Sequence, residues 1–246
     1  MTMQDDIIKI GLPIINKTNL YPMVKPQSTR ISPIKTIQED GVEVWNISFT
    51  SLDCTYVESV RHIASQGPLP MEIFAERPAG DIYKAVVVHL EVEAGGEISL
   101  LDLKAYLAQV EKGDALIVDA NGYTDKWMAE SRGVINVDDY NLNSPYFSDQ
   151  AMKGIINAGV AILAGDFPSF SSPRTEEGFS TNMIAEFYKT QENMILAPLT
   201  DLDKIEETKV VLQINPLEIE GCCGLVCSPV VYQGKLKASF LEYLKE

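Results

Sequence analysis

The chain has 246 residues, 46% of them hydrophobic, which is enough for the core of one large α/β domain or two small ones. Twenty Lys and Arg against 35 Asp and Glu give a formal net charge of −15, and so acidic a surface argues against binding to nucleic acid. No apolar run approaches the ~20 residues of a membrane span. The first nine residues lack a secretory signal, so we expect a cytoplasmic protein with no membrane partner.

The N-terminal segment is rich in proline, which forbids long helices there. We interpret residues 1–40 as an extended arm that wraps the domain or a neighbouring subunit. Residues 42–49 follow, with the alternation that is typical of a half-buried strand.

Residues 49–63 contain Glu58 and His62, one of only two histidines in the chain. We expect both side chains just past the end of the preceding strand, where a rigid scaffold presents reactive groups. The same residues have simpler interpretations: Glu58 as a solvated acid or an ion-pair partner of Arg61, and His62 as a capped, hydrogen-bonded residue.

Strands and helices alternate along the rest of the chain, which predicts the α/β class. Ser99 and Asp102 form a capping box at the start of a helix, and Gly113 and Gly159 are typical helix stops. His89 lies inside a predicted buried strand, where a lone histidine is usually a hydrogen-bonded core residue. The expected strands are 85–92, 114–119, 160–164, 193–196 and 209–217, and the expected helices include 181–191 and a short C-terminal helix within 234–246.

The four cysteines do not have the spacing of a zinc site, and we interpret them as reduced thiols. Cys54 is either a nucleophile or a small buried thiol. Cys222 and Cys223 lie in a turn between two glycines, where they could line a pocket or simply pack. Cys227 follows close by.

Residues 52–62 resemble the signature of the cyclase family, the metal-dependent hydrolases that include kynurenine formamidase and isatin hydrolase. That signature reads His-x-Gly-Thr-His-x-Asp-x-Pro-x-His, and here Thr55 and His62 match while Glu58 replaces the aspartate. Later segments follow in the family's order, and they are Gly165-Asp166-Phe167-Pro168-Ser169, Pro216-Leu217-Glu218-Ile219-Glu220-Gly221 and Ser228-Pro229-Val230.

The resemblance implies one layered β/α domain of the cyclase and kynurenine formamidase type over residues 1–246, assembled as a homodimer or homotetramer. It also implies a pocket for a small carbonyl compound, lined by Cys54, Asp166, Tyr21 and Trp127. Two of these have alternatives: Tyr21 as part of a surface arm, and Asp166 as a loop cap that binds backbone amides.

The family's metal ligands do not carry over to this chain. The two early histidines are replaced by Leu52 and Tyr56, and the later histidine and glutamate fall at or near Asn182 and Ala197. No histidine follows His89. Zinc and manganese require imidazoles or several carboxylates, so we expect no metal cofactor. Tyr56 is then interpreted as filling the volume of a metal-bound histidine.

Three hypotheses remain open from the sequence. The first is a hydrolase or a cyclase or isomerase that uses metal-free acid–base chemistry, with Glu58 and His62 as the pair and Tyr56 or Cys54 assisting. The second is a non-catalytic pseudoenzyme that binds a small molecule or serves as a structural subunit. The third is a zinc or manganese hydrolase with rearranged ligands, drawn from Asp53, Glu58, His62, Asp166 and the late cysteines.

Overall fold

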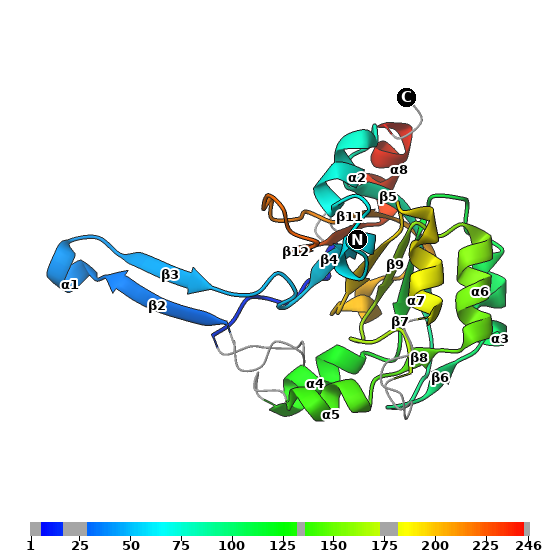
Figure 1. Ribbon diagram of the computed structural model, residues 1–246, viewed down its shortest axis with the longest axis horizontal. Helices are drawn as coiled ribbons and strands as arrows, with labels where there is room; N and C mark the ends of the chain where they lie inside the picture. Colours follow the sequence, from blue (N-terminus) through cyan, green and yellow to red (C-terminus); the bar gives the residue numbers. More distant parts are fainter. Residues whose placement is uncertain (1–5, 17–28, 132–135, 173–181, 244–246) are drawn as a thin grey trace.

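A nine-stranded mixed sheet forms the centre of the computed structural model, which describes residues 6–16, 29–131, 136–172 and 182–243 (Figure 1). Its four central strands, β5, β7, β9 and β10, are parallel, and the strands on either side are antiparallel. In spatial order the strands are β1 (Ile7–Lys9), β13 (Val230–Tyr232), β11 (Lys209–Gln213), β5 (Ile82–His89), β7 (Ala115–Asp119), β9 (Ile162–Gly165), β10 (Met194–Ala197), β4 (Tyr56–Ser59) and β12 (Gly224–Val226).

The parallel strands are apolar on both faces because apolar side chains pack on each side of the sheet. Val86 and Val118 face the larger apolar cluster, while Val87 and Ile117 face the smaller one. The larger cluster is covered by α3 (Leu100–Leu107), α6 (Asp149–Ala158), α7 (Asn182–Phe187) and η3 (Tyr188–Thr190). Other elements of the body are α2 (Pro70–Glu76), β6 (Glu97–Ile98), α4 (Tyr123–Ser131), α5 (Val137–Leu142), β8 (Tyr146–Phe147), η4 (Leu202–Lys204) and α8 (Gly234–Tyr243).

Several locally determined predictions are confirmed. The Ser99 hydroxyl accepts from the amide of Asp102, and the Asp102 carboxylate accepts from the amide of Ser99 at 2.8 Å, as a capping box requires. Gly159 ends α6 with a left-handed backbone. The five strands expected after residue 80 are all present, although β11 is shorter than predicted.

A two-stranded hairpin projects from the body of the molecule (Figure 1). It consists of β2 (Arg30–Lys35) and β3 (Val44–Ser48), joined through α1 (Ile37–Asp40). The prediction of a strand over 42–49 is therefore right in type, but its half-buried environment is wrong, because every residue of β3 is exposed. The expected arm over residues 1–40 is divided: β1 joins the edge of the main sheet and β2 belongs to the hairpin.

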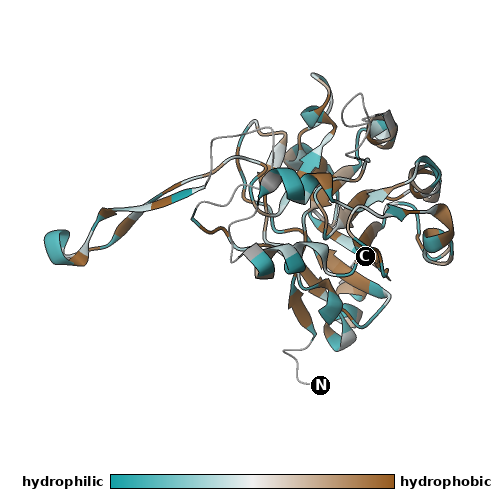
Figure 2. Cartoon of the chain, turned by 90° about the horizontal axis from the view of Figure 1, so that it is seen from below, coloured by the Kyte–Doolittle hydropathy of each residue, from teal (hydrophilic) through white to brown (hydrophobic). Residues whose placement is uncertain are grey.

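Four apolar side chains lie together on one face of the hairpin. Ile31 pairs with Ile47 and Pro33 pairs with Trp45, and these four side chains share a face because paired and alternate strand residues point the same way. Figure 2 shows brown, apolar segments along this projecting arm. Of the described helices, none is both long and apolar enough to cross a membrane.

Candidate functional site

Strand β4 places Tyr56 and Glu58 on the same face of the sheet. In its ladder with β10, Tyr56 pairs with Ala197 and Glu58 pairs with Ile195, while Val57 between them points into the smaller apolar cluster. Glu58 therefore lies inside a strand and not past its end as the sequence suggested. The side chain of Tyr56 is buried on this face, two residues before Glu58.

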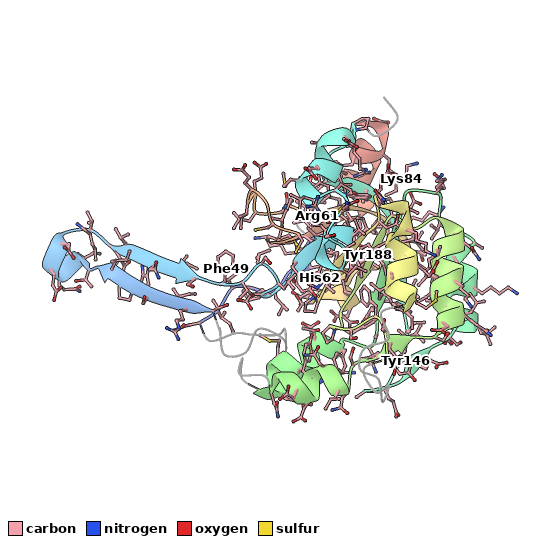
Figure 3. All side chains as sticks on the ribbon, in the orientation of Figure 1. Phe49, Arg61, His62, Lys84, Tyr146 and Tyr188 are labelled. Atoms are coloured by element: carbon pink, nitrogen blue, oxygen red, sulfur yellow. The ribbon has the colours of Figure 1, made fainter. Side chains whose placement is uncertain are left out.

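Glu58 is a carboxylate buried against an apolar cluster, with only 7% of its surface exposed. The Tyr188 hydroxyl donates a 2.9 Å hydrogen bond to Oε1, and the Nε2 atom of His62 lies 3.7 Å from Oε2. Burial raises the pKa of Glu58 above its ordinary value of 4.5, and the neighbouring His62 and Tyr188 offset part of that rise. Figure 3 shows His62 and Tyr188 beside each other at the centre of the molecule.

His62 ends the 3₁₀ turn η2 (Val60–His62), which follows β4 directly. The Ser59 hydroxyl accepts from the amide of Arg61 and donates to the carbonyl of Pro68 at 2.8 Å. The guanidinium of Arg61 donates to the carbonyl of Gly67, also at 2.8 Å. These bonds fasten the turn, so His62 is held against Glu58 while 23% of its side chain stays exposed to solvent.

Cys223 approaches the opposite side of the His62 ring. Its Sγ atom lies 3.8 Å from His62 Nδ1. Its carbonyl accepts from the amide of Ser59 at 3.1 Å, which extends the ladder of β12 and β4 by one residue and fixes the thiol beside the imidazole. Burial, followed by the charge of Glu58, raises the pKa of this half-buried thiol.

Cys54 has the properties of a structural thiol. It is fully buried, its Sγ atom lies 3.5 Å from the carbonyl oxygen of Pro13, and burial together with Asp53 raises its pKa to about 12. Its backbone is left-handed, with a φ of 57°, a conformation that favours glycine. The environment favours the interpretation as a small buried thiol over that of a nucleophile.

Asp166 and Trp127, expected to line the pocket, both contact residues between positions 120 and 140. The fully buried Asp166 accepts hydrogen bonds from the amides of Ala120, at 2.7 Å, and Tyr123, at 2.6 Å. It therefore holds the turn between β7 and α4, which is the alternative role for this aspartate. Trp127 packs on the rings of Tyr123 and Tyr140, with centroids 6.3 and 5.8 Å away. Tyr21 lies outside the described residues.

Replacing Asp166 with asparagine should destabilise the protein. The amide oxygen preserves one of the two backbone hydrogen bonds, but the amide nitrogen is turned toward the other N–H donor and leaves it unsatisfied. An unpaired buried donor costs about 1–3 kcal/mol, so we expect the free energy of unfolding in urea to fall by that amount. Asp138→Asn, at an exposed carboxylate on α5, is the control; equal stability of the two variants would contradict the structural role of Asp166.

The second histidine is part of a structural ion pair and not of the core. His89 ends β5, where its Nδ1 lies 2.8 Å from Asp119 Oδ2 and its Nε2 lies 3.0 Å from the carbonyl oxygen of Ile205. Both neighbours are acceptors, so the doubly protonated imidazolium satisfies both bonds, and the bond to Asp119 raises the pKa of His89. The prediction of a hydrogen bond is right, but the predicted core position is wrong because 44% of the side chain is exposed.

Two cavities lie away from Glu58 and His62. One, of about 750 Å³, is lined by residues of α3, β8 and α6, including Tyr146; the other, of about 540 Å³, lies beside α2 and β5 and includes Lys84. In Figure 3, Tyr146 and Lys84 are well separated from His62 and Tyr188. The candidate pair therefore lies in neither of these two hollows.

Asp53, proposed as a rearranged ligand, belongs to the loop before β4. Its Oδ2 atom accepts from the hydroxyl of Thr29 and the amide of Thr50, each at 2.9 Å. Over the ranges that the structure describes, no three His, Cys, Asp or Glu side chains form a group that could hold a metal ion.

Sequence reasoning missed Tyr188 and left Cys223 without a role. Tyr188 belongs to an ordinary apolar helical pattern, and its position 130 residues after Glu58 provides no local signal. For Cys223 the only signal was its place in a glycine-flanked turn.

The family and fold follow from comparison with known proteins. A family model described as "Putative cyclase" matches residues 8–172. No curated protein matches the chain.

Isatin hydrolase A from Ralstonia solanacearum superposes with a TM-score of 0.72 and 12% identity, covering 92% of this chain and 90% of its own. Isatin hydrolase A from Labrenzia aggregata, solved with benzyl benzoate, gives a TM-score of 0.69 and 13% identity, covering 92% of each chain. A structure described as a "predicted metal-dependent hydrolase" from Bacillus stearothermophilus gives a TM-score of 0.67 and 14% identity, covering 92% of this chain and 97% of its own. At these identities the likeness establishes the fold alone, and it confirms the predicted fold class.

Proposed function

Because this chain belongs to the cyclase family, we propose that it is a hydrolase or cyclase that acts on a small amide, lactone or related carbonyl compound. His62 and Glu58 are its acid–base pair. The observation that carries this proposal is the buried Glu58 carboxylate, held between the Tyr188 hydroxyl at 2.9 Å and the partly exposed His62 at 3.7 Å. A buried carboxylate beside an accessible imidazole is the usual arrangement for proton transfer near neutral pH.

The two residues have different tasks in the proposed reaction. His62 reaches solvent and exchanges a proton with the attacking group and then with the leaving group. Glu58 stays behind it and stabilises the imidazolium that forms in between. Tyr188 orients the carboxylate from the other side, and Tyr56 lies beside Glu58 on the same face of β4, where it can assist.

The donor set supports a reaction without a metal. Leu52, at the position of the family's first histidine, is a buried side chain with no donor atom, and Tyr56 replaces the second. Glu58 already uses Oε1 to accept from Tyr188. At these ligand positions of the family, the one carboxylate and one phenol that remain do not fit the ligand preferences of zinc or manganese.

The structures named isatin hydrolase direct the choice of substrates. Isatin is a cyclic amide with an adjacent ketone, so isatin, N-formyl anilines and aryl lactones form a suitable test panel. An activated ester such as 4-nitrophenyl acetate adds a sensitive general probe, because its leaving group needs little protonation.

One observation favours the non-catalytic alternative. The cavities of about 750 and 540 Å³ are lined by other residues, so a small molecule bound in either would not touch Glu58 or His62. A binding protein or structural subunit that retains the family fold would have this property. The proposed enzyme requires instead that the substrate reaches the exposed edge of His62.

The test combines metal analysis with turnover. Protein purified without chelator is analysed for metals by plasma mass spectrometry and assayed on the panel before and after dialysis against a chelator. We expect hydrolysis that is unchanged by metal removal. Activity that disappears with the chelator and returns with zinc or manganese would instead support the rearranged metallohydrolase, and absence of turnover across the panel would favour the binding protein.

We also propose that the protein forms a homodimer or homotetramer through the hairpin. Trp45 and Ile47 are 48% and 54% exposed on its apolar face, and an isolated two-stranded ribbon is marginally stable in water. A second copy presents an identical apolar ribbon, so two copies can bury these faces symmetrically.

All four cysteines are free thiols, which supports the cytoplasmic location expected from the sequence.

A further inference from the structure

We propose that Cys223 is a nucleophile activated by His62, so that Cys223, His62 and Glu58 act as a Cys–His–Glu triad. This inference rests on the proposed function and specifies its chemistry as acyl transfer through a covalent thioester. It is based on a continuous chain of side chains: the Cys223 thiol, the His62 ring and the Glu58 carboxylate, completed by the hydroxyl of Tyr188.

The two ring nitrogens of His62 face the two groups that a triad requires. Nδ1 lies 3.8 Å from the sulfur of Cys223, and Nε2 lies 3.7 Å from a carboxylate oxygen of Glu58. A proton on Nε2 is attracted by the carboxylate, which leaves the lone pair of Nδ1 facing the thiol. Glu58 thereby selects the tautomer in which His62 can accept the thiol proton, and the third group orients the base as nucleophilic sites require.

The backbone holds this geometry from both sides. The carbonyl of Cys223 accepts from the amide of Ser59, the residue that follows Glu58 in β4 and caps the turn carrying His62. The thiol and the base are therefore attached to one hydrogen-bonded ladder. Both side chains remain partly exposed, so a carbonyl compound can approach the sulfur from solvent.

The neighbouring cysteine provides an internal contrast. Cys222 is also half-buried, but it packs against the smaller apolar cluster. Cys54 and Cys227 are buried and have raised pKa values. Among the four thiols, Cys223 is the one that combines partial exposure with a described contact to a base.

The reaction balances with water as the only co-reactant. As the sulfur forms a bond to the substrate carbonyl carbon, the thiol proton passes to His62 Nδ1 and the carbonyl π electrons move to its oxygen. The tetrahedral intermediate collapses to a thioester, and the leaving group takes the proton from His62. Water then attacks the thioester, His62 accepts its proton and returns it to the sulfur, and the carboxylic acid is released.

Burial and the charge of Glu58 raise the pKa of Cys223, so the resting group is the neutral thiol. Its proton must be removed during attack, and the thiol therefore depends on His62. This separates the triad from a site with a preformed thiolate and makes the His62 variant informative.

The first experiment measures thiol reactivity without any substrate. The native full-length protein is treated with iodoacetamide at pH 7.5, and alkylation of each cysteine is followed by peptide mass spectrometry. We expect His62→Ala to slow the alkylation of Cys223 by roughly tenfold or more, because the neutral thiol loses its base, while the alkylation rate of Cys222 is unchanged. Equal rates for Cys223 in the two proteins would overturn the proposal.

The second experiment seeks the covalent intermediate with 4-nitrophenyl acetate. After acid quenching, intact mass spectrometry should show one acetyl group, and peptide mapping should place it on Cys223. Cys223→Ala should lose the adduct and lower kcat/KM by at least about a hundredfold, while Cys222→Ala retains both.

The two proposals fail in distinguishable ways. Hydrolysis that survives Cys223→Ala but is lost in Glu58→Gln overturns the nucleophile and leaves the acid–base function standing. A Cys223 that depends on His62 for alkylation, in a protein that turns over no substrate of the panel, supports the activated thiol and contradicts the proposed hydrolase.

Discussion

Glu58→Gln should lower kcat/KM for hydrolysis by about 10²–10⁴-fold, the usual contribution of general acid–base catalysis. Glutamine is nearly isosteric and can still accept from Tyr188, but it has no charge with which to stabilise the imidazolium of His62. His62→Ala should cause a loss of similar size, and the double variant little more, because the two residues act as one unit. Steady-state kinetics on the panel of carbonyl substrates measures both effects.

The matched control is Asp114→Asn. Asp114 is also a largely buried carboxylate whose pKa is raised by burial, but it lies before β7 and accepts from the backbone of Glu111. We expect kcat/KM to be unchanged in this variant. Equal losses in the two variants would point to general destabilisation, and unchanged activity in Glu58→Gln would exclude Glu58 from the chemistry.

The pH profile provides a second readout of the same pair. Only ionised Glu58 stabilises the imidazolium, so activity should rise with pH through the pKa of this carboxyl. Burial raises that pKa above 4.5, and the acid limb of kcat/KM should therefore lie above the ordinary glutamate range. In Glu58→Gln, the rise of kcat/KM with pH that comes from ionisation of Glu58 should be absent.

Raising the pH through the pKa of Glu58 should lower the stability of the protein while it raises the activity. The folded pKa of Glu58 is raised, so the unfolded chain ionises first as the pH rises. The contribution of Glu58 to stability is then complete below about pH 4.5 and is lost as the pH passes through the raised folded pKa. Glu58→Gln removes this loss, and we expect its free energy of unfolding at neutral pH to exceed that of the native protein.

Replacing Trp45 and Ile47 together with serine should convert the assembled protein to monomers. Each large apolar side chain contributes about 1.5–3 kcal/mol when buried. In a symmetric interface both copies carry each substitution, so the loss of binding free energy is doubled. The dissociation constant should rise at least about a thousandfold. Analytical ultracentrifugation over a range of protein concentrations measures the change.

Asn46→Ser is the control for the hairpin. Asn46 lies between the two replaced residues on β3 but points to the opposite face, paired with Ser32. We expect this variant to sediment like the native protein. A native protein that is monomeric at all concentrations, or an assembly that survives loss of Trp45 and Ile47, would contradict the proposed interface.

The elements that could be predicted were those whose signals lie within a few residues. Ser99 and Asp102 cap α3 through each other's backbone amides, and Gly159 ends α6 because its backbone is left-handed. The apolar run at residues 85–88 is a buried strand, as predicted without knowledge of its neighbours in the sheet. Such signals depend on steric and hydrogen-bonding preferences that do not require the rest of the fold.

Spacing alone was a poor guide to the environment of a residue. Glu58 and His62 are four apart, but one belongs to a strand and the other to a 3₁₀ turn. Residues 44–48 alternate as a half-buried strand does, yet they pair with β2 and project from the body. Alternation specifies that a strand has two unlike faces, and only the fold decides what covers them.

The sequence by itself determined the α/β class, the order of the central strands along the chain and the stretch that holds Glu58 and His62. Only the tertiary structure decided what surrounds this pair. Tyr188 and Cys223 come from segments 130 and 161 residues distant, brought in by η3 and by the pairing of β12 with β4. It also gave Asp166 its partners, the backbone amides of Ala120 and Tyr123. Contacts between distant segments arise from the packing of whole elements, because burying apolar faces on both sides of the sheet determines which side chains meet.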